Sequence, residues 1–496
     1  MELREDKLQR GLGLLDATMI VMGSMIGSGI FITSAESTRL LSAPGWLLLA
    51  WTMAGLLTIF GALCCAELAA MLPRAGGQYV FLRAAYGPSV GFLFGWTLFL
   101  VIQTGTIAAV AIAFAKFAGV FFPQIANEHY LVRPIQLFRG YAISLSTEQL
   151  VAVLLILLLS WVNTLGLTIG KLVQNTFTLA KTAALFGLII AGLSLGWSAQ
   201  CAARSSAWWD PWANGWTPQV AQPGLTMIGS LAVVVIFGKA MVGPIFAQTA
   251  WTNVTFTGSE IRDPGKTLPR ALLIGCGTVV VLYLLANLVY LATLSLGEIA
   301  HAPQNRVAVS AMRAIFGSAG ASAMAAAILV STFGCDNGLI LAGARVYYAM
   351  AKDRLFFRAI ARTNRQHVPA AALTAQGLWA AFLTLPRTVT VDAKGAISYG
   401  NVYTQLLEYI VAADLVFYVL LVGSVIVLRL RNPGLARPYR AWGYPVVPIL
   451  AITLATGLII DLAMLAPTTC GIGFAIVLSG LPAFLLWRSP NDKAAA

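Results

Sequence analysis

Long apolar segments recur from one end of the chain to the other, and they constrain the fold more than any other feature of the sequence. A helix needs about 20 predominantly apolar residues to cross the hydrocarbon core of a bilayer. Twelve segments reach or approach that length: 15–40, 45–71, 89–121, 147–167, 173–198, 227–257, 270–294, 309–343, 368–385, 404–428, 444–466 and 469–487. The sequence therefore predicts an all-α polytopic membrane protein with about 12 transmembrane helices, in which residues 1–496 form a single transmembrane domain.

The low content of charged residues supports this class. Only 10% of the 496 residues are charged, and 58% are hydrophobic. A soluble chain carries about 25% charged residues because water must wet its surface, so most of this surface must face lipid. The net charge of +13 is compatible with nucleic acid binding, but the basic residues lie in short loops between apolar segments, where they orient membrane proteins. We therefore expect the lipid bilayer as a partner and no nucleic acid.

The distribution of basic residues predicts the orientation. With the N-terminus inside, 21 Lys and Arg fall in cytoplasmic loops, 7 fall on the outer side, and 4 lie within or at the ends of segments. Cytoplasmic loops of membrane proteins carry such an excess. We therefore expect both termini to be cytoplasmic. The first apolar segment lacks a small-residue cleavage site, which predicts a retained helix rather than a signal peptide.

Two of the segments contain stretches that would interrupt a helix at membrane depth. Residues 23–31 hold three glycines and two serines in the middle of the first segment, and residues 243–253 hold a Gly-Pro pair in the middle of the sixth. Unwound backbone is tolerated in a bilayer only where it lines a cavity, although such glycines also serve close helix packing. Interruptions at corresponding positions of two halves indicate a midplane binding site. We therefore expect a five-plus-five inverted repeat, with helices 1 and 6 broken at the midplane.

The repeat boundaries follow from the segments. Repeat one covers about residues 15–198, repeat two about 227–428, and helices 11 and 12 about 444–487. Each interruption frees backbone N–H groups on one half-helix and C=O groups on the other. The N–H end attracts a carboxylate and the C=O end attracts an ammonium. A zwitterionic amino acid matches both ends.

Short motifs occur in a fixed order along the chain. They are 27–31 (GSGIF), 66–68 (AEL), 73–79 (PRAGGQY), 82–83 (LR), 85–88 (AYGP), 92–96 (FLFGW), Phe246-Ala247, Trp251, Glu260, Asp263-Pro264, Leu268-Pro269, Gly334, Asn337-Gly338, Ala344-Arg345 and Asp353. This series resembles the amino acid–polyamine–organocation superfamily, and is most similar to its L-type amino acid transporter branch, including bacterial members. The resemblance implies an integral protein of the plasma membrane, which in a bacterium is the inner membrane.

The resemblance implies a substrate site built from backbone groups at the two interruptions. The N–H groups that would bind the substrate carboxylate belong to Gly27, Ser28 and Gly29. The carbonyls that would hold the amino group belong to Met25, Phe246 and Thr249. Phe246 would also gate the bound substrate, and Trp251 stands where the family has a gate-side tryptophan, although it equally suits an ordinary core aromatic.

Lys181 lies deep inside the fifth segment. An ionisable residue in the middle of a membrane helix is costly and is a functional hypothesis by default. The resemblance implies that its ammonium takes the place of the sodium ion of sodium-coupled relatives, and that it bridges the carbonyl of Gly23 and the side chain of Ser331. We therefore expect a coupling role for these three residues and no sodium requirement.

These features predict a sodium-independent amino acid transporter, either an exchanger or a uniporter, for neutral amino acids. Alternatives remain: a proton-coupled symporter in which Lys181 releases its proton, a cationic amino acid or polyamine exchanger that uses Asp336, and a non-transporting sensor. Lys239 is a further charge inside a segment, and it and Asp336 either pair internally or bias selectivity or proton coupling. An enzyme is not expected, because the three histidines lie in loops, the six cysteines lack metal spacing, and no GxxxxGK[ST] motif occurs. We expect no metal and no cofactor.

Two departures from the resembled branch carry further predictions. The loop 122–146 contains no cysteine, whereas animal members bond a glycoprotein heavy chain through one there, so no disulfide-linked heavy chain is expected. Thr249 and Ala250 stand where some members have two glycines, which predicts a narrower pocket and a preference for small amino acids.

Overall fold

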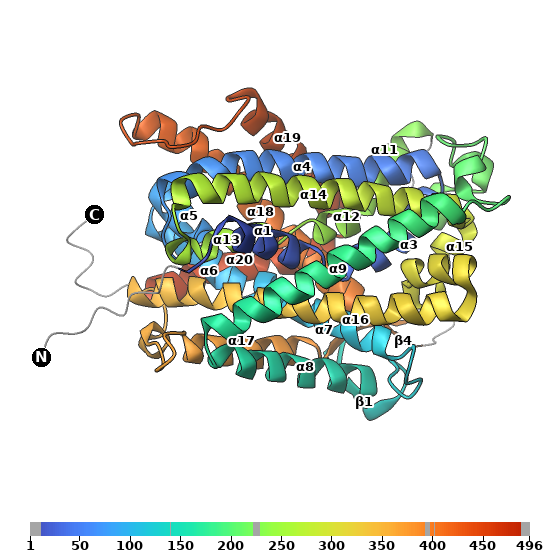
Figure 1. The fold of residues 1–496 in the computed structure, drawn as a ribbon, viewed down its shortest axis with the longest axis horizontal. Coiled ribbons are helices and arrows are strands. Elements are labelled where there is room, and N and C mark those ends of the chain that lie inside the picture. The colour runs from blue at the N-terminus through green and yellow to red at the C-terminus, as the bar shows by residue number, and fades with distance from the viewer. Residues whose placement is uncertain (1–10, 139, 222–228, 392–396, 401, 488–496) are drawn as a thin grey trace, which may run out of the picture.

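The computed structural model describes residues 11–487, apart from 139, 222–228, 392–396 and 401 (Figure 1). Long helices run side by side along the longest axis of the molecule, and loops lie towards its two ends. The helices up to residue 195 are α1 (Leu14–Met25), α2 (Gly29–Ile32), α3 (Ser34–Leu41), α4 (Pro44–Met71), α5 (Gln78–Tyr86), α6 (Pro88–Thr97), the π-helix η1 (Leu98–Ile102), α7 (Gln103–Ala118), α8 (Thr147–Thr164) and α9 (Leu167–Leu195).

The rest of the chain is also mainly helical. Its α-helices are α10 (Pro218–Ala221), α11 (Ser230–Ala240), α12 (Val242–Ala247), α13 (Asn253–Phe256), α14 (Pro264–Thr293), α15 (Leu296–Ala300), α16 (Val307–Lys352), α17 (Ala370–Leu383), α18 (Val402–Arg431), α19 (Val446–Leu465) and α20 (Pro467–Trp487). Short 3-10 turns are η2 (Ala202–Arg204), η3 (Trp212–Asn214), η4 (Gly258–Glu260), η5 (Pro303–Asn305) and η6 (Arg358–Ala361).

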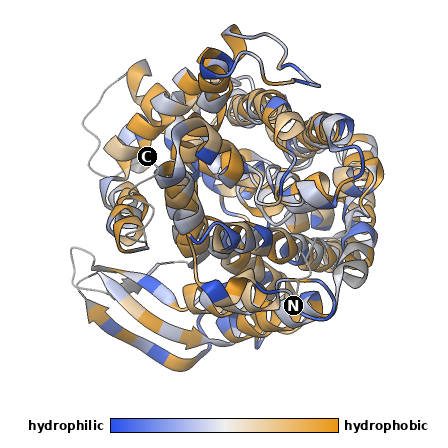
Figure 2. Cartoon of the chain, turned by 90° about the vertical axis from the view of Figure 1, so that its left-hand side faces the viewer, coloured by the Kyte–Doolittle hydropathy of each residue, from blue (hydrophilic) through white to orange (hydrophobic). Residues whose placement is uncertain are grey.

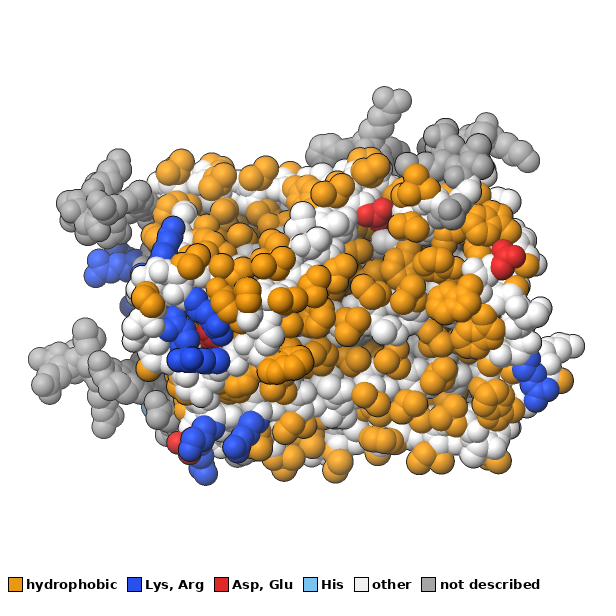
Figure 3. All heavy atoms as spheres, turned by 90° about the horizontal axis from the view of Figure 1, so that it is seen from above, with side chains coloured by type: hydrophobic (Ala, Val, Ile, Leu, Met, Phe, Trp, Pro, Cys, Tyr) orange, Lys and Arg blue, Asp and Glu red, His pale blue; other side chains and the backbone are white. Residues whose placement is uncertain are grey.

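The class predicted from the sequence, a polytopic helical membrane protein, is confirmed. Among the described residues, ten helical stretches are long and apolar enough to cross a membrane. Two shorter apolar helices, Leu231–Ala247 and Ala370–Leu383, fall in the predicted sixth and ninth segments. They are short because residues 248–252 interrupt the sixth segment and strand β3 follows the ninth. Figure 3 shows hydrophobic side chains across the middle of one face, with Lys and Arg gathered towards its ends.

A small sheet corrects the expectation of a purely α-helical chain. Strands β1 (Tyr130–Phe138), β2 (Tyr141–Ser146), β3 (Pro386–Val391) and β4 (Ile397–Tyr399) pair antiparallel in the order β1-β2-β3-β4. The sheet lies at one edge of the helix bundle (Figure 2). Its strands are rich in the β-branched and aromatic residues that favour extended backbone. The buried Arg387 of β3 donates from Nε to Oγ of Ser144 in β2, at 2.6 Å, and so joins two loops that are far apart in the sequence.

Glycines let the long helices α14 and α16 pack closely against α1 and α9. A Cβ added at Gly275 of α14 would lie 2.6 Å from Val21 Cγ1 of α1. One added at Gly334 of α16 would lie 2.4 Å from Phe177 Cβ of α9. Such close packing substitutes for the hydrophobic driving force that helices lack inside lipid.

Charged side chains buried in the bundle form ion pairs at one end of it. Glu67 of α4 accepts from Arg429 of α18, with Oε2 to Nη2 at 2.6 Å, and from the backbone N–H of Ala441. Glu260 of η4 pairs with Arg345 of α16, with Oε1 to Nε at 3.1 Å, and both side chains are only 1% exposed. Pairing is required here because an unpaired buried charge is strongly destabilising.

The Glu260–Arg345 pair gives a test of the packing. We expect Arg345→Ala to lower the stability of the purified protein by about 3–5 kcal/mol, because it leaves the Glu260 carboxylate buried without its partner. Thermal unfolding in detergent measures the loss, and Arg354→Ala, at an exposed arginine just beyond α16, is the control. Equal melting temperatures for the two variants would contradict the role given to the pair.

Candidate functional site

The first interruption separates α1 from α2. Helix α1 ends at Met25, and Ile26, Gly27 and Ser28 lead into α2 at Gly29. The N–H of Gly27 donates to the carbonyl of Met25 at 2.8 Å, so one of the three predicted carboxylate donors is engaged within the chain. Two helix ends therefore meet at this interruption, and the residues that form it are buried.

The two glycines of this interruption lie against other helices. A Cβ added at Gly29 would lie 2.5 Å from Ala247 Cβ of α12. One added at Gly27 would lie 2.9 Å from Cys335 Sγ of α16 but 3.7 Å from Cys335 Cβ. In this conformation the glycines therefore serve close packing, which is the simpler of the two roles that the sequence allowed.

The second interruption separates α12 from α13. Residues 248–252 form it, and Ala250 has a φ of 67°, a left-handed conformation that costs a non-glycine residue free energy. Oγ1 of Thr249 donates to the carbonyl of Phe246 at 2.7 Å. The carbonyl of Met25 accepts from Oη of Tyr283 at 2.9 Å. The carbonyl of Met25 also accepts from the N–H of Gly27, and that of Phe246 also accepts from the N–H of Thr249 at 3.2 Å. Two of the three carbonyls predicted to hold an amino group thus each accept two hydrogen bonds within the chain in this conformation.

Lys181 of α9 reaches the end of α1. It is 0% exposed, and its Nζ donates to the carbonyls of Gly23, at 2.6 Å, and Ile26, at 2.8 Å. These carbonyls lie at the C-terminal end of α1, where acceptors lack helical partners and the helix dipole favours a cation. The ammonium therefore satisfies backbone groups that the interruption leaves without helical partners.

Ser331 of α16 contacts the same stretch of backbone. Its Oγ lies 3.3 Å from the carbonyls of both Ile26 and Gly27. The ammonium reaches the expected carbonyl of Gly23, and Ser331 and Lys181 meet through the shared carbonyl of Ile26. The sequence could not reveal this, because the interruption turns Ile26 towards both helices.

The two predicted gate residues are both buried. Phe246 is 6% exposed and Trp251 is 5% exposed. Trp251 lies beside α4, because a Cβ added at Gly61 would be 2.8 Å from Trp251 Cζ2.

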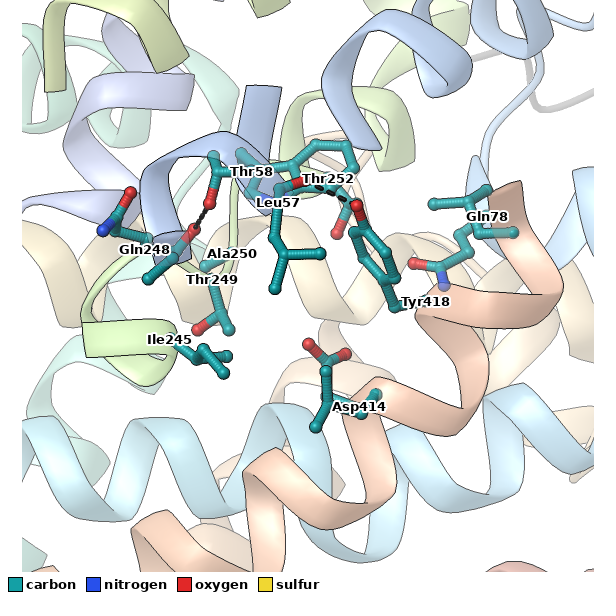
Figure 4. Close-up of a pocket in the computed structure, with 14 residues that line it drawn as sticks. Leu57, Thr58, Gln78, Ile245, Gln248, Thr249, Ala250, Thr252, Asp414 and Tyr418 are labelled. Atoms are coloured by element: carbon teal, nitrogen blue, oxygen red, sulfur yellow. Dashed lines mark hydrogen bonds between the residues drawn. The ribbon is translucent and has the colours of Figure 1, made fainter. Parts of the chain in front are cut away.

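A cavity of about 40 Å³ borders the second interruption (Figure 4). Its walls come from α4, α5, α12, the interruption itself and α18. Its lining residues are Ala54, Leu57, Thr58, Gln78, Ile245, Gln248, Thr249, Ala250, Trp251, Thr252, Asp414, Leu415, Tyr418 and Leu421. A second cavity of about 20 Å³ shares Gln78, Thr249, Ala250, Thr252 and Asp414 with it. Of the predicted site residues, Thr249 and Trp251 line the larger cavity, and the residues of the first interruption line neither. The structure therefore does not gather all of the predicted residues around one cavity.

Asp414 of α18 is a cavity residue that the sequence analysis missed. Its carboxylate points into the larger cavity in Figure 4. Within the described part of the chain it makes no hydrogen bond or ion pair. The signal was present, because an aspartate in the middle of the apolar segment 404–428 satisfies the same rule that singled out Lys181.

The two other charges noted in the sequence have different surroundings. Asp336 of α16 is 0% exposed, its carboxylate oxygens have no hydrogen-bond partner among the described residues, and it lines neither of these cavities. Lys239 of α11 lines a separate small cavity together with Glu36 and Glu408. An acidic group beside the second interruption is therefore supplied by Asp414 rather than by Asp336. No group of three or more potential metal ligands occurs among the described residues.

Comparison with known proteins gives consistent matches over almost the whole chain. The model of the amino acid permease family matches residues 12–483. The large neutral amino acids transporter small subunit 2 of Mus musculus is 30% identical over 484 residues, which cover 97% of this chain and 81% of that protein. The serine/threonine exchanger SteT of Bacillus subtilis is 28% identical over 98% of both chains. The Asc-type amino acid transporter 1 of Mus musculus is 26% identical over 97% of this chain and 82% of that protein.

The contact between Gly27 and Cys335 gives a test of the packing at the first interruption. We expect Gly27→Ala to destabilise the protein by about 1–3 kcal/mol through overpacking, and Cys335→Ala to restore most of the loss because it removes the Sγ atom that the new Cβ meets. Thermal unfolding of the two single variants and the double variant measures the coupling. Gly187→Ala, whose added Cβ meets no atom within 4 Å, is the control. A double variant no more stable than Gly27→Ala alone would refute the packing role.

Proposed function

The chain belongs to the amino acid permease family, and we propose that it is a sodium-independent transporter that exchanges neutral amino acids. The relatives described above support the substrate class, because their names specify large neutral amino acids, serine and threonine. One of them is named as an exchanger. The family and these relatives are transporters, so we do not assign an enzymatic activity.

The buried ammonium of Lys181 is the observation that carries the proposed sodium independence. It occupies the carbonyl-rich end of α1, with two oxygens within 2.8 Å of Nζ. Carbonyl and hydroxyl oxygens gathered at a helix C-terminus are also what a dissolved sodium ion would need. A covalently attached cation in that place removes the need for one.

The proposed substrate site uses the half-helices that meet at the two interruptions. The N–H groups at the start of α2, including those of Ser28 and Gly29, would bind the α-carboxylate. The carbonyls at the end of α12, including that of Phe246, would hold the ammonium. In the cycle that we propose, the carbonyl of Phe246 exchanges the hydrogen bonds that it now accepts within the chain for one from the substrate ammonium, under the gates Phe246 and Trp251.

We also propose the finer architecture expected from the sequence. The interrupted helices α1–α2 and α12–α13 would occupy equivalent places in a five-plus-five inverted repeat of a twelve-helix protein. The excess of Lys and Arg on one side supports cytoplasmic termini in a plasma membrane, the inner membrane in a bacterium. The loop that contains β1 and β2 has no cysteine, so the transporter would function without a disulfide-linked heavy chain.

Sodium replacement tests the proposal directly. In proteoliposomes that contain the purified chain alone, we expect uptake of labelled alanine to be equal in sodium and choline buffers. Lys181→Ala should lose at least about tenfold of this uptake, because two charge-assisted hydrogen bonds to α1 are removed. Lys352→Ala, at the exposed end of α16, is the matched control. A sodium requirement in the wild type would refute the role of Lys181.

A second test concerns exchange and substrate size. Internal amino acid should stimulate uptake, whereas an imposed proton gradient should not. Because the cavity beside Thr249 and Ala250 is small, serine and alanine should compete with labelled substrate better than tryptophan. Stimulation by the proton gradient alone would favour the proton-coupled alternative, and a ranking led by tryptophan would refute the predicted narrow pocket.

A further inference from the structure

Asp414 differs from Glu67, Glu260 and Asp336 in where its carboxylate points. Glu67 and Glu260 are buried and paired with arginines, and Asp336 is enclosed and lines neither of the cavities at the second interruption. Asp414 is half-buried, and its carboxylate faces the cavity at the second interruption (Figure 4). No described residue donates a hydrogen bond to it. Polar groups in protein interiors are normally paired, so this carboxylate is free to accept a donor from a ligand.

The walls of the cavity do not compensate the charge of Asp414. Among the residues that the structure describes, no Lys, Arg or His lines either of the two cavities that Asp414 borders. A carboxylate without a cation beside it binds a donor more strongly at membrane depth than in water, because the local dielectric constant is low. The electrostatics of the cavity therefore select for a donor or a positive charge on the ligand.

The neighbouring donors are directed elsewhere. Oγ1 of Thr249 donates to the carbonyl of Phe246, and Oη of Tyr418 donates to the carbonyl of Leu57 at 2.5 Å. Nε2 of Gln78 is directed to the carbonyl of Phe417 at 3.5 Å. Because these three groups are engaged with backbone, they do not donate to Asp414, which is left as an acceptor facing the cavity.

We infer that Asp414 binds the side chain of the substrate, and that the cavity selects small amino acids whose side chain carries a hydrogen-bond donor, such as a hydroxyl. The inference rests on the proposed function, because it places the α-carboxylate and ammonium of an amino acid at the two interruptions. From Thr249, which belongs to the second interruption, the side chain then enters the cavity that Asp414 closes on the α18 side. A volume of about 40 Å³ admits a side chain of a few atoms rather than an aromatic ring.

Threonine and valine are the sharpest pair of probes, because they have the same shape and differ in a hydroxyl. We expect threonine to inhibit the uptake of labelled alanine into proteoliposomes at least about tenfold more strongly than valine, since a hydrogen bond to a charged group contributes that much. In Asp414→Leu, which keeps the shape of the side chain but has no acceptor, the ratio of the two inhibition constants should fall close to one. In Asp414→Asn, which keeps one acceptor oxygen, the ratio should lie between these values.

A ligand with a positively charged side chain distinguishes the effect of the Asp414 charge from that of a neutral hydrogen-bond acceptor. 2,4-Diaminobutyrate carries a short side-chain ammonium, and we expect both variants to weaken its inhibition more than tenfold relative to that of valine. Asp461→Asn, at an aspartate of α19 that lines neither cavity, is the control and should leave both ratios at their wild-type values.

The outcomes distinguish this inference from the proposed function. Absence of alanine uptake by the wild type would overturn the proposed function itself. Uptake with equal inhibition by threonine and valine in the wild type would overturn only the role of Asp414, even if no variant folds. A variant that lowers uptake but leaves the threonine-to-valine ratio at its wild-type value would also overturn it, and would indicate a role in coupling. A ratio that falls in the order wild type, Asn, Leu supports the inference.

Discussion

The contact between the Lys181 ammonium and the end of α1 is the interaction on which the rest of the site depends. A helix that stops in the middle of a bilayer leaves carbonyls without partners, and lipid supplies none. Nζ of Lys181 binds the carbonyls of Gly23 and Ile26, and Oγ of Ser331 contacts those of Ile26 and Gly27. Sγ of Cys335 contacts the carbonyl of Ser24 at 3.3 Å. Side chains of α9 and α16 thus supply hydrogen bonds to the carbonyls of the interruption. Without them, buried carbonyls would lack partners, and the interruption would be destabilised.

The second interruption is stabilised differently, and this difference underlies the different roles that we propose for the two interruptions. Its backbone groups are bonded largely to each other, through Thr249 and Phe246, and one residue, Ala250, has a left-handed conformation. It borders cavities rather than a fixed cation. In the proposed site, the first interruption is therefore the anchored half. The second is the half that faces the cavity, where Asp414, unpaired among the described residues, would present an acceptor to a substrate side chain.

Much of the fold could be predicted from the sequence, because the bilayer imposes simple rules. Segment length located the helices, and the glycines around Gly27 and the Gly-Pro pair at Pro244 located the two interruptions. The sheet was missed because its strands are short and lie in loops between strongly apolar segments. The sharing of the Ile26 carbonyl depends on the path of unwound backbone, which no periodic pattern encodes. Asp414 was visible as a charge in an apolar segment, but its orientation towards a cavity depends on the rotation of α18.

The central claim is that an amino acid binds with its carboxylate at the first interruption and its ammonium at the second. An experimental structure of the protein with bound threonine measures this most directly. We expect the threonine carboxylate to lie within hydrogen-bonding distance of the N–H groups of Ser28 or Gly29. We expect its ammonium to lie within hydrogen-bonding distance of the carbonyl of Phe246. Threonine bound with either group more than about 4 Å from these atoms, beyond direct hydrogen-bonding range, would contradict the account.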